Sequence, residues 1–370
     1  MLYRLQVPRL LWLSGGFITL PKAHKQLRTL EKGKFFSRRL CKVEISVSDF
    51  RMSDAILLPV SLWYSFSYSP LHPFRQGVPV TRWQQQLQYW MNAACRMEVL
   101  SPKPGNVCPG KEFDNASVRD FLHSAAAIAP VIALAQEQSL GQTILNAVRA
   151  TRAVVSHNTN LGIILLTAPL ATVPPEQSLI EGVERVLAAT TLQDSSLVYE
   201  AIRLASPGGL GDAGEEDVAS QPTRTLRECM ALAADRDLIA AQYANGFQQI
   251  LENGMLWLRD SSEITRSQPE QITWLALKLL AGFGDTLIVR KCDFATSARA
   301  QTLAADVLQT GWPQSPEGQN SLLVLDEFLR ADGNRRNPGT TADCVAAILF
   351  AAQREGWYTM NPSEFSYADE

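Results

Sequence analysis

Apolar residues recur every three to four positions along most of this chain, and this spacing constrains the fold more than any other feature. The first clear example lies between residues 83 and 99, where Leu87, Trp90, Ala94 and Met97 would share one face of a helix. We find no stretch that alternates apolar and polar residues as a half-buried strand would, and no internal repeat. The sequence therefore predicts an all-α fold with a single multi-helix domain, and 370 residues are enough to bury a large core.

Further helices are expected wherever the same spacing continues between capping residues and breakers. Ser117 begins the second helix, and the segment Ser101–Gly105 ends the first. The run Gly162–Leu170 fits a strand or a buried helix, and we favour a helix because its surroundings are helical. The remaining expected helices cover residues 139–155, 177–190, 195–205, 222–252, 269–281, 293–310, 319–331 and 341–355, with Gly254 and Gly311 as stops.

The first 51 residues differ from the rest in charge. They hold eleven Lys or Arg and three Asp or Glu, whereas the whole chain has a net charge of −3, so the remainder carries about −11. An acidic body argues against nucleic acid as a partner. We expect the natural protein to begin at Met52, with residues 1–51 read from upstream sequence. A disordered basic extension, a targeting segment and a tether to an anionic surface are the alternatives.

The rest of the chain divides into three parts. Residues 52–82 hold four prolines among aromatic residues and serines, and we expect an irregular arm there. We expect residues 83–358 to form the all-α catalytic domain and residues 359–370 to form a C-terminal tail. No apolar run reaches the ~18 residues of a membrane span. The six cysteines lack the spacing of a metal site, and they indicate reduced thiols in a cytoplasmic protein. A homo-oligomer is possible from the sequence, which does not define the oligomeric state.

Glu98 stands at the end of the first helix, before a turn in which two prolines flank Lys103 and Gly105 follows. The prolines fix the backbone and the glycine permits a sharp turn, so we expect Lys103 to hold its ammonium group rigidly against a phosphate. Glu98 would then reach a metal-bound phosphate. A plain interhelical turn with a solvated lysine is the alternative.

A second polar segment places Asn158, Thr159 and Asn160 just before Gly162 and the apolar run. Buried amides and hydroxyls need hydrogen-bond partners, which a ribose or a phosphate would supply. A capping and turn cluster is the alternative. The glycine-rich loop Ser206–Asp212 matches no nucleotide-binding fingerprint, and we expect a flexible loop there.

A third segment carries Asp285 and Thr286 shortly before two adjacent cations, Arg290 and Lys291. Asp285 is a candidate Mg²⁺ ligand, and the two cations are candidate clamps for phosphate oxygens. A solvated charge pair at a helix end is the alternative. Asp237 lies within the expected helix 222–252, where it would face inward or join a charged surface.

The fourth segment begins with Asn337 and opens the helix expected at 341–355. Thr340 at the N-cap and Asp343 three residues later have the outline of a capping box. Together with Gly339 and Thr341, this helix start offers free backbone N–H groups to a phosphate. An ordinary helix start is the alternative.

In this order, the segments resemble the triphosphoribosyl-dephospho-CoA synthase family, which supplies the precursor of the prosthetic group of citrate lyase and malonate decarboxylase. The likeness covers about residues 85–355, and family members are all-α. The matching residues are Glu98-Val99, Pro102-Lys103-Pro104-Gly105, Phe121, Ser124, Asn158-Thr159, Gly162, Asp285-Thr286, Arg290, Asn337-Pro338-Gly339 and Ala342-Asp343.

The resemblance implies a pentosyl transferase that uses small-molecule substrates. ATP and 3′-dephospho-CoA would give a 2′-(5″-triphosphoribosyl) derivative and free adenine, through an oxocarbenium-like transition state and with Mg²⁺ beside the triphosphate. Glu98, Asp237 and Asp285 are then the candidate catalytic carboxylates, and Glu98 and Asp285 are also the candidate metal ligands. The other residues of the four segments would bind the nucleotide and its partner substrate.

The chain departs from the family in the second segment. Members usually read Asn-Thr-His-Lys-Gly, whereas this chain has Asn160 and Leu161 in place of the His and the Lys. The lost positive charge indicates a divergent branch, so two alternatives stay open. One is (phospho)ribosyl transfer to another acceptor, as in methanopterin-type cofactor synthesis, and the other is a nucleotide-binding protein without catalysis. Dependence of adenine release on dephospho-CoA separates these functions.

Overall fold

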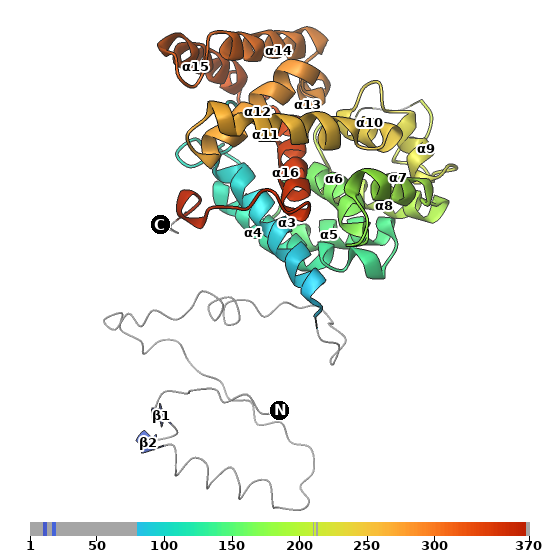
Figure 1. Cartoon of the computed structure of the whole chain (residues 1–370). Helices are drawn as coiled ribbons and strands as arrows, with labels where there is room; N and C mark the ends of the chain where they lie inside the picture. Colours follow the sequence, from blue (N-terminus) through green and yellow to red (C-terminus); the bar gives the residue numbers. More distant parts are fainter. Residues whose placement is uncertain (1–9, 13–16, 20–79, 210, 212–213, 368–370) are drawn as a thin grey trace, which may run out of the picture. The chain divides into compact units, whose positions relative to one another are not determined.

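The computed structural model describes residues 10–12, 17–19, 80–209, 211 and 214–367 (Figure 1). The chain forms two compact units, Met1–Gln76 and Gly77–Glu370. In the first unit, β1 (Leu10–Trp12) and β2 (Phe17–Thr19) pair as antiparallel strands, a short hairpin that the helical spacing did not predict. Apart from this hairpin, the expected extension 1–51 and the arm up to residue 79 lie outside the described residues.

The second unit is built from helices, which confirms the all-α expectation (Figure 1). Thr81 and Ser117 cap the first two helices through capping boxes with Gln84 and Asp120. The α-helices are α3 (Arg82–Leu100), α4 (Val118–Ile132), α5 (Leu140–Val154), α6 (Leu161–Thr172), α7 (Leu179–Ala188), α8 (Leu192–Ala205), α9 (Leu226–Ala231), α10 (Leu238–Asn245), α11 (Met255–Ile264), α12 (Gln268–Phe283), α13 (Thr286–Lys291), α14 (Phe294–Gln309), α15 (Pro316–Arg330) and α16 (Gly339–Arg354). The shorter helical turns are η2 (Ala135–Glu137), the π-helical η3 (Gln249–Gly254) and η4 (Pro362–Glu364).

Helices α6 and α16 form the centre of the main core. Every residue of α6 from Leu161 to Ala171 is buried, as a helix without a polar face requires. Helix α16 is buried from Cys344 to Gln353 and packs against both α3 and α6. The helical interpretation of Gly162–Leu170 is therefore confirmed, and this helix packs against the largely buried α16.

A second, smaller core lies among α12, α14 and α15. It contains Leu277 and Leu280 of α12, Ala304 of α14, and Leu325 and Leu329 of α15. In Figure 1, α14 and α15 lie beside α12 at one end of the helical unit. The chain returns from α15 to the start of α16, so this small core is joined directly to the central helix.

The expected long helix 222–252 is wrong. A turn separates α9 from α10, because Asp237 caps α10: its Oδ1 accepts hydrogen bonds from the backbone N–H groups of Ile239 (2.9 Å) and Ala240 (3.1 Å). An aspartate side chain competes for backbone donors in this way, and it therefore starts helices more readily than it continues them. Asp237 stands at a helix start, where its other oxygen stays available for a contact.

Gly254 does not end a helix, because η3 continues directly into α11. A Cβ atom at Gly254 would lie 2.2 Å from Cδ1 of Ile348, so the glycine allows α16 to pack closely there. Gly311, in contrast, follows the end of α14 with a φ of +84°, as expected for a stop. The six-residue helix α13 was not expected, since it is too short to show a periodic pattern.

One helical stretch among the described residues, Val118–Glu137, is long and apolar enough to cross a membrane by length and composition alone. Core helices of folded domains meet the same criterion, and α4 packs against α3 and α5.

The residues near the C-terminus also belong to the helical unit. Phe365 is buried and its carbonyl accepts a hydrogen bond from Nε of Arg96 (2.8 Å). The last described residues therefore pack against α3.

Candidate active site

A cavity of about 1110 Å³ lies where the end of α3 and the starts of α6, α10 and α16 meet α13. This volume slightly exceeds that of a typical small-molecule pocket, so two substrates can occupy it together. The predicted site residues that line it are Glu98, Asn158, Thr159, Asn160, Gly162, Asp237, Arg290, Lys291, Asn337, Gly339, Thr340 and Asp343. Those that do not line it are Lys103, Gly105, Asp285, Thr286 and Thr341.

Lys103 lies beneath Glu98 instead of reaching into the cavity. Both side chains are buried, and the Lys103 Nζ lies 3.0 Å from Oε1 of Glu98. Nζ also donates hydrogen bonds to the backbone carbonyls of Glu98 and Ser101. A buried ion pair of this kind is stable only because each charge has its partner. Lys103 therefore neutralises Glu98, and the phosphate contact expected for it does not fit this position.

Asp326 of α15 holds the turn that carries Lys103, and no motif in the sequence indicated this residue. Its Oδ1 accepts hydrogen bonds from the backbone N–H of Gly105 (2.7 Å) and from Nε of Arg330 (2.9 Å), and Oδ2 accepts one from Nζ of Lys111 (2.7 Å). Gly105 has a φ of +73°, which suits a glycine. Asp326 and Arg330 are four residues apart on a helix, a spacing that is typical of ion pairs on exposed helix surfaces. The sequence therefore did not predict the role of Asp326 in the turn.

Asp285 joins α13 to α16. As the N-cap of α13, its Oδ1 accepts hydrogen bonds from the backbone N–H groups of Leu287 (2.9 Å) and Ile288 (3.1 Å). Its Oδ2 accepts hydrogen bonds from the backbone N–H (2.7 Å) and the hydroxyl (2.9 Å) of Thr341. Burial raises the pKa of Asp285, and these hydrogen bonds oppose the rise. Both oxygens are thus fully used inside the protein.

The expected capping box at the start of α16 is wrong. The helix begins at Gly339, two residues earlier than expected, and neither Thr340 nor Asp343 caps it. The backbone N–H of Thr341 bonds instead to Asp285, and the Thr340 hydroxyl lies 3.2 Å from that of Thr286. Because the Pro-Gly turn starts the helix, Thr340 faces α13 and Asp343 is left to face the cavity.

Cationic side chains line the cavity on the side of α10, α13 and the loop before α16. Arg290 forms an ion pair with Asp237, and Nζ of Lys291 donates a hydrogen bond to Oδ1 of Asn337 (2.9 Å). Burial lowers the pKa of Lys291. Arg236 and Arg335 also line the cavity on this side. We call Arg236, Arg290, Lys291 and Arg335 the cationic wall, of which the sequence segments indicated only Arg290 and Lys291.

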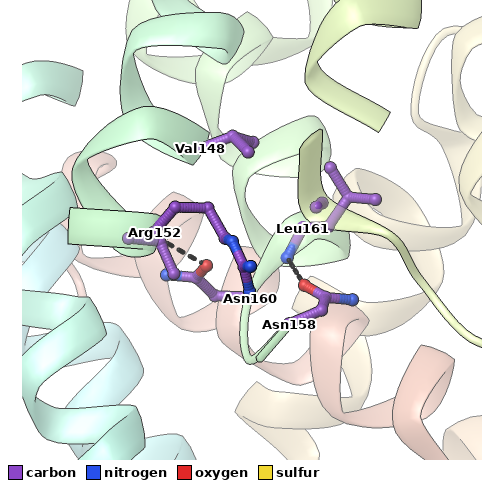
Figure 2. A pocket seen from close by; sticks show the side chains of 7 residues that line it. Val148, Arg152, Asn158, Asn160 and Leu161 are labelled. Carbon is purple, nitrogen blue, oxygen red and sulfur yellow. Dashed lines mark hydrogen bonds between the residues drawn. The ribbon is translucent and has the colours of Figure 1, made fainter. Parts of the chain in front are cut away.

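Amides and hydroxyls surround the start of α6 on another part of the cavity lining. Figure 2 shows Asn158 and Asn160 from the other side, where they line a small neighbouring pocket together with Arg152 of α5. Oδ1 of Asn158 accepts a hydrogen bond from the backbone N–H of Leu161 (3.1 Å), and the Thr159 hydroxyl lies 2.6 Å from that of Ser124. Oδ1 of Asn160 accepts a hydrogen bond from the Thr151 hydroxyl (2.9 Å). The expected polar cluster is therefore partly a capping cluster and partly a cavity surface.

Asp343 is the carboxylate of the lining for which the described structure shows no ion pair and no hydrogen bond. A Cβ atom on Gly162 would lie 2.0 Å from Oδ2 of Asp343, so the carboxylate packs directly against the start of α6. Burial, and then the nearby carboxylates Glu98 and Asp285, raise the pKa of Asp343 well above its ordinary value. A carboxylate held in this way is suited to accept a proton.

The model of the ATP:dephospho-CoA triphosphoribosyl transferase family matches residues 84–362. The chain belongs to this family. It is therefore a transferase, and triphosphoribosyl transfer to dephospho-CoA is the activity of its family.

A solved structure agrees with this assignment to the transferase family. The crystal structure from Archaeoglobus fulgidus that carries the provisional name triphosphoribosyl-dephospho-CoA synthase is 28% identical, with a TM-score of 0.51. The match covers 64% of this chain and 100% of that chain. No curated protein shows significant similarity to the sequence.

Proposed function

We propose that this transferase moves the triphosphoribosyl unit of ATP to a hydroxyl of 3′-dephospho-CoA and releases adenine. The observation that carries the proposal is the unpaired carboxylate of Asp343 in the same cavity as the cationic wall. The carboxylate of Asp343 can accept the proton that a hydroxyl nucleophile loses, and the cationic wall can bind a triphosphate.

The reaction breaks the bond between adenine and the anomeric carbon of the ATP ribose. The oxygen of the acceptor hydroxyl bonds to that carbon, its proton passes to Asp343, and adenine leaves with a proton from the surroundings. Negative charge near the ring stabilises the oxocarbenium-like transition state. Of the carboxylates predicted from the sequence, Glu98 and Asp237 line the cavity but are paired with Lys103 and Arg290, and Asp285 lies outside the lining. Asp343, before it accepts the proton, supplies the unpaired negative charge.

The expected Mg²⁺ site at Glu98 and Asp285 does not fit this geometry, because both oxygens of Asp285 accept hydrogen bonds within the protein. The described residues also contain no group of three His, Cys, Asp or Glu side chains that could hold a metal ion. Mg²⁺ is usually bound through substrate phosphates and one or two carboxylates. We therefore treat Mg²⁺ as part of the ATP substrate.

Adenine release tests the proposal directly. Wild-type protein with ATP and Mg²⁺ is expected to release adenine only when 3′-dephospho-CoA is present, and chromatography should show one new product per adenine. Adenine without acceptor would indicate a hydrolase. If the protein binds ATP but releases no adenine, the related ribosyl transfer to another acceptor is favoured.

We also propose a cytoplasmic location. The five described cysteines are all free, as reduced thiols in a cytoplasm would be.

Replacing Lys291 with methionine is expected to raise the KM for ATP about 10- to 100-fold, because a charge-assisted hydrogen bond to a phosphate contributes about 1.5–3 kcal/mol. The KM for dephospho-CoA should change little. Lys278→Met is the matched control, since Lys278 lies over Trp257 and Trp274 and does not line the cavity. Steady-state kinetics with each substrate varied in turn checks this, and an unchanged KM for ATP would contradict it.

A further inference from the structure

The departing adenine must gain a proton, because the neutral base is a far better leaving group than its anion. In ATP the triphosphate is attached at C5′ and adenine at C1′, on opposite sides of the ribose. With the triphosphate at the cationic wall, adenine therefore extends away from that wall. The acid that protonates adenine is expected in the part of the lining beyond the ribose.

Asp343 marks the position of the ribose, since it takes the proton of the attacking hydroxyl. Its helix, α16, packs against both α13, which carries Arg290, and α3, which ends near Glu98. Burial raises the pKa of Asp343 most, then Glu98 raises it and Arg290 lowers it, so both charges act on this carboxyl. Asp343 thus lies between the cationic wall and the end of α3, where adenine is expected.

An apolar part of the lining adjoins the end of α3 and the start of α4. It contains two buried valines and three partly buried residues that pack against them. We call this set the apolar end, and its members are Val99, Val107, Phe113, Ala116 and Phe121. Aromatic and aliphatic side chains pack well on the flat faces of a purine ring, so the apolar end suits adenine.

A buried amide adds a polar group beside the apolar end. Asn106 lines the cavity and is 6% exposed, and its Nδ2 donates a hydrogen bond to the carbonyl of Pro338 (3.4 Å). Its Oδ1 accepts no hydrogen bond from the part of the chain that the structure describes. This oxygen can therefore accept a hydrogen bond from a ligand, as the exocyclic amine of adenine would require.

His157 lines the cavity next to the apolar end. Its Nε2 lies 3.9 Å from Oδ2 of Asp120, the residue that precedes Phe121 on α4. Nε2 is buried, whereas about a third (32%) of the side chain is exposed, and Nδ1 makes no hydrogen bond with a described residue. A carboxylate beside one ring nitrogen orients an imidazole and leaves the other nitrogen for a reacting group. Nδ1 is therefore the nitrogen available to a ligand.

The charged groups near His157 come from two helices. On α4, Asp120 is within ion-pair distance, and its neighbours Arg119 and His123 are exposed. On α5, Arg152 donates a hydrogen bond to the backbone carbonyl of Ser156. A negative and a positive charge thus lie close to the imidazole, and a test of His157 must leave both in place.

A second apolar part of the lining, on α8 and α9, lacks a comparable acid. Its apolar residues include Ile202, Leu226 and Met230. The Tyr199 hydroxyl donates a hydrogen bond to the carbonyl of Glu216 (2.7 Å), and burial raises the pKa of both Tyr199 and Cys229. Neither group gives up a proton readily, so this part of the lining is left for the acceptor substrate.

We propose that His157 is the catalytic acid that protonates adenine as it leaves. This inference rests on the proposed function, which makes adenine the leaving group. The electron pair of the bond between C1′ and N9 passes to adenine, and the proton on Nδ1 of His157 passes to a ring nitrogen of the base. Asp343 takes the proton of the acceptor hydroxyl. One proton is given and one is taken, and both residues then exchange protons with solvent.

His157→Gln tests the assignment. The kcat for adenine release is expected to fall about 10²- to 10⁴-fold, the usual contribution of a positioned acid, whereas the KM for ATP should change less than about threefold. The wild-type kcat should fall at high pH as the imidazole loses its proton, and the variant should lack this fall. His123→Gln is the matched control, because His123 is exposed on α4 and does not line the cavity.

A donor that needs no acid provides a second measurement. In 7-methyl-ATP the purine already carries a positive charge, so it leaves as a neutral base without gaining a proton. His157→Gln should lower kcat with this donor by less than about 10-fold, whereas Asp343→Asn should lower it as much as it does with ATP. The pH profile is measured with ATP alone, so it decides the question even if the methylated donor is not turned over.

Equal losses of kcat with ATP and 7-methyl-ATP would overturn the inference, because the variant would then have lost more than an acid. A higher KM for ATP with an unchanged kcat would overturn it as well and assign His157 to binding. A variant that keeps the wild-type fall at high pH would have the same consequence. Wild-type protein that releases no adenine from ATP would instead contradict the proposed function itself.

Discussion

Replacing Asp343 with asparagine is expected to lower kcat for adenine release by about 10²- to 10⁴-fold, the usual contribution of a positioned general base. The amide has the same shape but cannot accept the proton of the acceptor hydroxyl. The KM values should change much less than kcat, because asparagine still fits beside Gly162. Single-turnover measurements of adenine formation check this, since they isolate the chemical step.

The same substitution has a defined pH signature. Burial and the neighbouring carboxylates raise the pKa of Asp343 well above its ordinary value of 3.8, so the wild-type rate should rise with pH through that raised pKa, as the carboxylate form appears. The folded protein holds this proton more tightly than the unfolded chain. Its contribution to stability is therefore present below the ordinary pKa and is lost as pH rises through the raised pKa.

Asp343→Asn should therefore be more stable than the wild type at neutral pH, by about 1 kcal/mol, while it loses activity. Thermal melts at several pH values measure this difference. Asp306→Asn on α14 is the control, because Asp306 is exposed and lies outside the cavity. A variant with wild-type kcat, or with a rate that keeps the wild-type pH dependence, would contradict the role of Asp343.

Replacing Lys103 with methionine is expected to destabilise the protein by about 3–5 kcal/mol, because it leaves the buried charge of Glu98 without its partner. Both side chains are at most 6% exposed, so solvent cannot replace the lost contact. Chemical denaturation followed by circular dichroism measures the free energy of unfolding.

The double variant Lys103→Met with Glu98→Gln should regain most of the lost stability, since it removes both charges. The exposed pair of Arg149 and Glu200, with a distance of 2.6 Å, is the control, and Arg149→Met should cost less than ~1 kcal/mol. Equal losses at the buried and the exposed pair would mean that Lys103 does not act by neutralising Glu98.

Local features carried the sequence predictions that the structure confirms. Helical spacing predicted an all-α fold, and Ser117 predicted a helix start, because both depend on residues three or four positions apart. The apolar run 162–170 required an inference from its surroundings, which also holds. The expected helix 222–252 failed because Asp237 takes its backbone donors from its own neighbours, a choice that the apolar spacing does not reveal.

The predictions for the site were likewise partly right and partly wrong. The polar segments predicted from the sequence do meet in one cavity, but several of their members have other tasks there: Lys103 neutralises Glu98, and Asp285 ties α13 to α16. Asp343, expected to cap a helix, remains unpaired instead. Such differences arise because hydrogen bonding between distant segments decides which carboxylates are used up and which stay available.

The helical class of this protein, its family and the segments that supply its site follow from the amino-acid sequence alone, since periodicity, turns and short motifs are local properties of the chain. Which side chains face the cavity, and which carboxylate lacks a partner, depends on how the helices pack. Burial and pairing depend on residues such as Gly162 and Asp343, which are far apart in sequence and adjacent in the fold.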